Sequence, residues 1–344
     1  MNSAYGALLN EHCRFYDKRI GQSVTLSGRQ IVRHMMSTIN ESVTGDYNYE
    51  GPAIVYGDTD SCYFTAYPAL KSQIESGELT WDKETCIGLY DGIADQANES
   101  FPAFMEKAFH APRKNGEIIK AGRELIGDRS IFITKKRYAI NIFDKEGKRK
   151  DKDGALGDIK AMGLDLKRAD TPKYVQEFLM DVLEMVLQRG KNREDVIERV
   201  KEFKRMLVAQ DSWTKGSPKS VNNLTKHTQI FDKTGKCGVG HARAAINWNY
   251  LRRMNGDNYS QQIVDGMKII VCKLKPNPLG FNSIAYPVDE LRLPTWFKEL
   301  PFDDGAMEST LVDEKVDNLL GVLNWDIKSN IDVKSTFDDL FTFG

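Results

Sequence analysis

Two aspartates, Asp58 and Asp60, stand one residue apart between two apolar segments, and residues 56–61 read YGDTDS. Alternate residues of a strand point to the same side, so a strand-turn-strand here can present both carboxylates to one point. Mg²⁺ binds one or two carboxylates and takes its other ligands from water and substrate phosphates. Two close carboxylates also repel each other unless a cation compensates. Asp and Gly are common turn residues, so the spacing alone favours an ordinary surface turn, and the alternative is a catalytic metal site at Asp58 and Asp60.

A second chemical signal is cationic: residues 135–139 read KKRYA, between two strand-like runs. Taken by itself, this run is most simply a solvated charge run on an edge strand. Residues 2–6, which read NSAYG, are by themselves no more than a helix start with Asn or Ser as its cap.

The carboxyl terminus is acidic and then abruptly apolar. Asp338 and Asp339 precede Leu340, Phe341 and Phe343. A short amphipathic turn with two or three apolar anchors suffices to dock in a hydrophobic groove. We therefore expect a docking peptide here, although a frayed terminus is the other interpretation.

Composition limits the class of protein without naming its function. The 344 residues are 41% hydrophobic and 28% charged, with a net charge of -1, which predicts a soluble protein of two or three domains. A near-neutral net charge does not exclude a local basic groove. Five cysteines without a CxxC pair indicate neither a zinc site nor a disulfide framework. We find no signal peptide and no run of about 18 apolar residues, so we expect a cytoplasmic protein without membrane contact.

Both helices and β-hairpins are predicted among the elements that must position these residues. Helical spacing predicts a helix over 24–40, with Ile31, Met35 and Ile39 toward a core and Arg29, Arg33 and Asn40 facing away. Residues 53–64 predict a β-hairpin, 85–110 a helix, and 130–143 a second hairpin.

The second half of the chain is dominated by helical patterns. Thr171 is a suitable N-cap and Pro172 a suitable first helical residue for a helix that continues until Gly190. A further amphipathic helix is predicted over 196–207, and extended chain over 266–286. The fold class is therefore α+β, and its second domain is mainly helical with a small extended insert.

Taken together and in order, the motifs resemble those of family B DNA polymerases of the T-even bacteriophage type. YGDTDS is similar to motif C of that family, NSAYG to the end of motif B, and KKRY to the palm segment that reaches the primer end. Residues 162–165, which read MGLD, resemble the start of the thumb. The matches are collinear from Asn2 to Phe343, which is almost the whole chain.

This resemblance implies an antiparallel palm with helices and a mainly helical thumb. Residues 1–10 would end a fingers helix, 11–160 would form the palm, 161–330 the thumb, and 331–344 a peptide that binds a sliding clamp. Asp58 and Asp60 would hold the catalytic metals. Asn2, Tyr5 and Gly6 would border the incoming dNTP, and Lys135, Lys136 and Tyr138 would contact primer-template DNA. Leu340, Phe341 and Phe343 would bind the clamp.

The family's exonuclease, its motif A aspartate and most of its fingers do not match any part of this sequence. Two-metal phosphoryl transfer needs a fuller carboxylate cage than Asp58 and Asp60 supply. The resemblance thus implies two Mg²⁺ ions completed by a carboxylate of a separate N-terminal polymerase chain, without which this chain is inactive. The alternatives are a non-catalytic DNA-binding and clamp-binding accessory protein, or a cloned fragment of a single-chain polymerase.

Overall fold

A computed structural model describes residues 2–325 and residue 327. The chain forms two compact units, and both combine helices with antiparallel strands, which confirms the α+β prediction. The first unit contains residues up to Asp128 together with Ile142–Asp158, and the second contains Arg129–Asn141 together with residues from Ile159 onward. Among the described residues, no helix has the length and apolar character that a membrane span requires.

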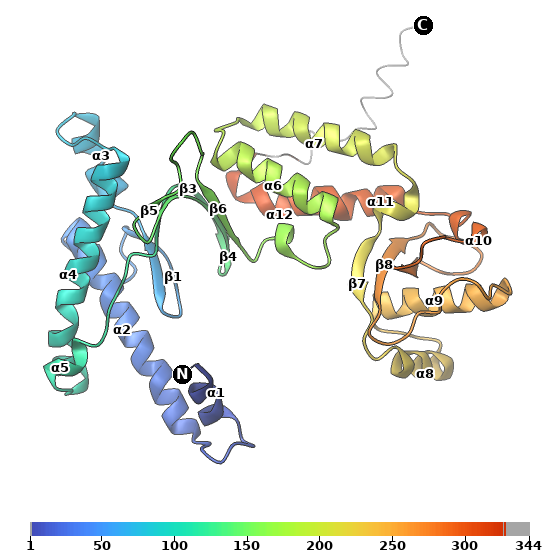
Figure 1. Cartoon of the computed structure of the whole chain (residues 1–344), viewed down its shortest axis with the longest axis horizontal. Coiled ribbons are helices and arrows are strands. Elements are labelled where there is room, and N and C mark those ends of the chain that lie inside the picture. The colour runs from blue at the N-terminus through green and yellow to red at the C-terminus, as the bar shows by residue number, and fades with distance from the viewer. Residues whose placement is uncertain (1, 326, 328–344) are drawn as a thin grey trace, which may run out of the picture. The chain divides into compact units, whose positions relative to one another are not determined.

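The first unit is built on two long helices and a short hairpin (Figure 1). Its helices are α1 (Asn2–Leu9), α2 (Lys18–Thr44), α3 (Tyr67–Glu75), α4 (Lys83–Phe109) and α5 (Arg113–Gly116). Strands β1 (Ile54–Asp58) and β2 (Ser61–Phe64) pair antiparallel. The remaining strands of the first half are β3 (Leu125–Thr134), β4 (Arg137–Lys145), β5 (Lys148–Arg149) and β6 (Asp158–Met162). They form one sheet in the order β3-β4-β5, with β6 also paired to β4.

The predicted helix 24–40 lies inside α2, which the chain delimits by local signals. Asp17 caps its first turn by accepting from the backbone N–H groups of Arg19 and Ile20, which satisfies donors that the helix itself leaves unpaired. Gly45, at φ 81°, ends it in the left-handed conformation that glycine adopts without strain. The predicted apolar stripe packs on α4, where Ile93, Ala97 and Phe101 are buried.

One residue of α2 contradicts the prediction. Asn40 was expected to face away from the core, but its side chain is fully buried. Its amide is paired on both sides: Oδ1 accepts from the Ala53 N–H at 3.1 Å, and Nδ2 donates to the Asp46 carbonyl at 2.8 Å. Burial of this polar group is tolerated because its hydrogen bonds are made inside the protein.

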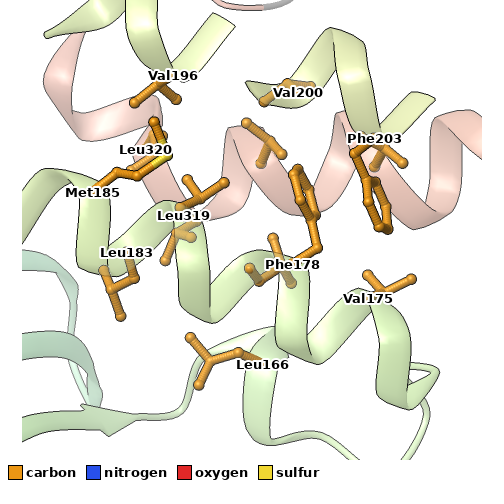
Figure 2. Close-up of a cluster of buried hydrophobic side chains, with 14 of the residues drawn as sticks. Leu166, Val175, Phe178, Leu183, Met185, Val196, Val200, Phe203, Leu319 and Leu320 are labelled. Carbon is orange, nitrogen blue, oxygen red and sulfur yellow. The ribbon is translucent and has the colours of Figure 1, made fainter. Parts of the chain in front are cut away.

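The second unit contains two hydrophobic cores. The first core joins α6 (Lys173–Leu187), α7 (Arg193–Val208) and α12 (Glu314–Leu320), as Figure 2 shows. Phe178 and Phe203 stack at its centre with ring centroids 3.9 Å apart. The predicted N-cap Thr171 is wrong by one residue, because Pro172 occupies the cap and α6 begins at Lys173.

The second core surrounds a three-stranded antiparallel sheet in the order β7-β8-β9. Its strands are β7 (Ser217–Ser220), β8 (Lys268–Lys273) and β9 (Ser283–Pro287), and its helices are α8 (Leu224–Thr234), α9 (Gly240–Met254), α10 (Thr295–Lys298) and α11 (Asp304–Glu308). The predicted extended insert over 266–286 corresponds to β8 and β9. Trp248 of α9 is fully buried and contacts Trp296 and Phe297. Short 3-10 helices at Asp165–Lys167, Ser212–Lys215 and Gly321–Leu323 and a π-helical turn at Ser309–Asp313 complete the described chain.

Candidate functional site

The two aspartates lie at the tip of the β1–β2 hairpin. Gly57 pairs with Cys62 and Asp58 with Ser61, so the connecting loop consists only of Thr59 and Asp60. Asp58 is the last residue of β1 and is partly buried, whereas Asp60 is exposed. Asp60 thus belongs to the turn, and the strand alternation that we used to orient both carboxylates does not extend to it.

The turn itself is strained. The Asp60 N–H donates to the Asp58 carbonyl at 2.7 Å, and the residue between them, Thr59, has a φ of 55°. A three-residue turn with a positive central φ is rare, and a β-branched residue in that region is an outlier. Such strain, of order 1–3 kcal/mol, persists where the surrounding structure imposes it, and it concentrates at functional sites. The Thr59 hydroxyl donates to Oδ1 of Asp58 at 3.1 Å, which adds a local tie between the turn and that carboxylate.

The hairpin contacts α2 and α4 at several points along its length. Asn40 fixes the backbone at Ala53, immediately before β1. Gly57 faces the side chain of Met36, and a Cβ at Gly57 would lie 3.1 Å from the Met36 sulfur. On the other strand, Phe64 packs edge-to-face on Tyr90 of α4, with centroids 5.3 Å apart. A rigid base therefore carries a tip at which Asp60 reaches solvent.

The carboxylates of Asp58 and Asp60 are suitable ligands for Mg²⁺, but two carboxylates do not complete a two-metal site. Asp58 and Asp60 supply two carboxylates within one short turn, which suits a cation that takes its other ligands from water and phosphates. Within the described part of the chain, no group of three or more His, Cys, Asp or Glu residues is arranged to hold a metal ion. Cys62 does not extend the set, because burial raises the pKa of its thiol to about 11 and keeps it protonated.

The predicted nucleotide-binding residues lie on α1, which contacts α2. Asn2 is the first residue of α1, Tyr5 is 37% exposed, and Gly6 has open space where a Cβ would stand. Leu9, at the end of α1, fits against Gly21. Gly21 and Met36 are separated by about 22 Å along α2, at about 1.5 Å per residue. The same helix therefore carries α1 and the aspartate hairpin at well-separated points.

The predicted DNA-contacting residues divide into two groups. Lys135 and Lys136 form the exposed two-residue turn between β3 and β4, and Lys136 has a φ of 61°. Tyr138 is only 7% exposed and stacks on Phe132, with centroids 5.5 Å apart. The lysines are thus presented to solvent, while the tyrosine packs within the hairpin. This turn belongs to the second compact unit and the aspartates belong to the first.

The predicted clamp-binding residues Leu340, Phe341 and Phe343 lie outside the described residues. Sequence reasoning also missed a residue that supports the site, Asn40. The signal was present, because Asn40 follows Met36 by four residues and so falls on the buried side of the helix.

Comparison with known proteins agrees with the motifs. A sequence model of DNA polymerase family B matches residues 1–76 and 113–273. The DNA-directed DNA polymerase of Escherichia phage RB69 is 32% identical over 301 residues, and that of Enterobacteria phage T4 is 28% identical over 302. Each alignment covers 83% of this chain and 32% of the phage protein. DNA polymerase 1 of Pyrococcus abyssi is 27% identical over 209 residues, which are 60% of this chain and 21% of the relative.

The chain therefore spans about a third of the length of the phage polymerases that it matches. The family match covers well over half of its residues and includes the aspartate hairpin and the lysine turn. On this basis the chain belongs to DNA polymerase family B and is similar to the polymerases of T4-like phages.

Proposed function

We propose that this chain is the palm and thumb part of a DNA-directed DNA polymerase, and that it contributes two of the carboxylates of a two-metal site. The observation that carries the proposal is the β1–β2 hairpin, whose rigid base presents Asp58 and Asp60 within one strained turn. The reaction is nucleotidyl transfer from a dNTP to the 3′-hydroxyl of a primer. Residues 1–10 end the fingers, 11–160 form the palm and 161–330 the thumb.

Asp58 and Asp60 hold Mg²⁺ in this proposal, and the ions, when bound, lower the charge repulsion between the primer oxygen and the triphosphate. The chain's own contribution is geometric. The two-residue turn keeps both carboxylates at one end of the hairpin, Asn40 holds the backbone at Ala53 before β1, and Met36 lies against Gly57 beside the turn. Asn2, Tyr5 and Gly6 of α1 border the incoming nucleotide.

The thumb grips the duplex through its phosphates, which makes binding independent of sequence and sensitive to salt. Lys135 and Lys136 contact the primer-template, and both are exposed at the end of a hairpin, where a groove can receive them. Tyr138 of β4 is buried against Phe132 of β3 and so supports the turn that joins these two strands.

Two carboxylates do not complete a two-metal cage, so we propose that a further carboxylate comes from a separate N-terminal polymerase chain with the exonuclease and motif A. The two chains associate through a large apolar interface. Residues 331–344, through Leu340, Phe341 and Phe343, bind a sliding clamp.

The test is primer extension with Mg²⁺ on a primed template, for this chain alone and after mixing with the remaining polymerase segments. Asp60→Asn removes one charge at an exposed position and should abolish extension by the mixture while leaving DNA binding intact. Glu146→Gln is the matched control, because Glu146 is an exposed acid in another hairpin turn of the same unit.

Extension by this chain alone would refute the need for a partner. Extension by the Asp60→Asn mixture would refute the metal-binding role. If no mixture extends a primer although DNA and clamp binding are retained, the chain is an accessory protein instead.

A further inference from the structure

The Lys135–Lys136 turn packs against Gly163, which follows it by almost thirty residues in the sequence. Gly163, directly after β6, has a φ of 63°, and a Cβ there would lie 2.1 Å from the carbonyl oxygen of Lys136. Only a glycine allows this approach. The backbone of residues 162–164 is thus in direct contact with the turn that presents the two lysines.

Two residues further on, Asp165 lies at the centre of three cations. Its carboxylate oxygens are 3.8 Å from Nη2 of Arg137, 3.5 Å from Nζ of Lys315 and 3.7 Å from Nε of Arg168. The side chains of Asp165 and Lys315 are only 15% and 12% exposed. The Asp165–Lys315 pair therefore interacts more strongly than a surface ion pair, whereas the side chains of Arg137 and Arg168 are 32% and 58% exposed and add less.

The same cluster fastens the lysine hairpin to α12. Nη2 of Arg137 donates to the backbone carbonyl of Asn318 at 3.5 Å, and Lys315, one turn earlier on α12, donates to the hydroxyl of Thr171 at 3.0 Å. Arg137, Asp165, Lys315 and Asn318 line one narrow crevice together with Leu164, Leu166, Leu179 and Leu319. Arg137 is thus half-buried and paired with Asp165 and Asn318, whereas its neighbours Lys135 and Lys136 are exposed.

We propose that Asp165 is a positioning residue for DNA binding: it holds Arg137 against α12 and so fixes the turn from which Lys135 and Lys136 meet the duplex. This inference rests on the proposed function, in which those lysines contact primer-template DNA. It divides the cationic run into two exposed lysines that contact DNA and one arginine that does not.

The test is a set of double-mutant cycles read as the dissociation constant of the polymerase mixture for a fluorescent primer-template. Asp165→Asn removes the charge at constant size and should weaken binding about fivefold, in the range of coupling energies that neighbouring groups show. In a background in which Lys135 and Lys136 are both replaced by alanine, the same change should weaken binding less than about twofold, because its effect passes through these two lysines. Asp181→Asn is the matched control, since Asp181 also pairs with two arginines in this unit and should leave binding unchanged.

A second cycle decides between positioning and direct contact, and it does not depend on Lys136. Arg137→Met should weaken binding as much as Asp165→Asn does, and the two changes together should be no worse than either alone. An additive loss would mean that Arg137 contacts DNA itself, which would overturn the inference.

The measurements distinguish a failure of the proposed DNA contact by the lysines from a failure of the proposed positioning role of Asp165. If replacing both Lys135 and Lys136 by alanine leaves binding unchanged, the DNA-contacting role of the turn is wrong. If that double variant weakens binding but Asp165→Asn does not, or does so equally in both backgrounds, only the positioning role is wrong. Thermal unfolding of each variant serves as the fold control, and Arg137→Met carries the test if Asp165→Asn does not fold.

Discussion

Asn40 joins α2 to the hairpin that carries the candidate metal ligands, so its removal has a defined structural consequence. In Asn40→Ala the buried Ala53 N–H loses its acceptor, and Ala53 is only 2% exposed. A buried donor without a partner costs about 1–3 kcal/mol. The space left beside Gly51, which packs directly on the Asn40 amide, adds a cavity term. We expect a total loss of about 2–4 kcal/mol from the free energy of unfolding of this unit.

A second substitution at the same position separates hydrogen bonding from packing. Asn40→Asp keeps an acceptor for Ala53 but replaces the donor to the Asp46 carbonyl with an oxygen and buries a negative charge. The buried charge is unfavourable until it is neutralised by a proton. Asn40→Asp should therefore be less stable than Asn40→Ala at neutral pH, and it should regain stability as the pH falls.

Hydrogen exchange of the full chain, measured by mass spectrometry on peptides covering residues 45–64, localises the effect to the hairpin. Guanidinium unfolding gives its size, with Ser42→Ala as the control because Ser42 is exposed on the same helix. The control should change stability by no more than about 0.5 kcal/mol. If Asn40→Ala unfolds with the wild-type midpoint and the Ala53 amide stays protected, the argument that this amide anchors β1 is refuted.

Three further results are expected from thermal or guanidinium unfolding. Phe178→Ala removes one ring of the buried stacked pair and should lower the free energy of unfolding by about 3–5 kcal/mol. The control Phe15→Ala changes a ring that is 71% exposed and should lower it by less than about 0.5 kcal/mol. Equal losses in the two variants would contradict the assigned core. Burial raises the pKa of Asp257, but hydrogen bonds from Ser260 and the Trp296 indole outweigh it and lower that pKa to about 2. Its stabilisation is therefore complete above the ordinary value of 3.8 and disappears as the pH falls toward 2, and Asp257→Asn should flatten this part of the pH profile. Burial lowers the pKa of His34, so stability should decrease as the pH falls below 6.5, and an unchanged acid profile in His34→Gln would show that this ring does not contribute.

Local sequence determined the elements and the residues with chemical potential. The helices over 24–40, 85–110 and 196–207 and the hairpin over 53–64 follow from periods of 3.6 and 2.0 residues, because these periods alone decide which side chains share a face. The motif order YGDTDS, KKRY and MGLD also predicted the family that the comparisons show. Periodicity was insufficient for β7, α8 and α9, which are short or packed on several sides.

Only the tertiary structure decided which polar residues have the hydrogen-bond partners that burial requires, because those partners are distant along the chain. Asn40 was assigned to solvent by its type, yet Ala53 and Asp46 supply the hydrogen bonds that make its burial acceptable. The cationic run at 135–137 reads as uniform, but the approach of Gly163 and the Asp165 carboxylate withdraws Arg137 and leaves the two lysines exposed. Residue type thus predicts which chemistry is available, and the packing of remote segments determines which of those groups can perform it.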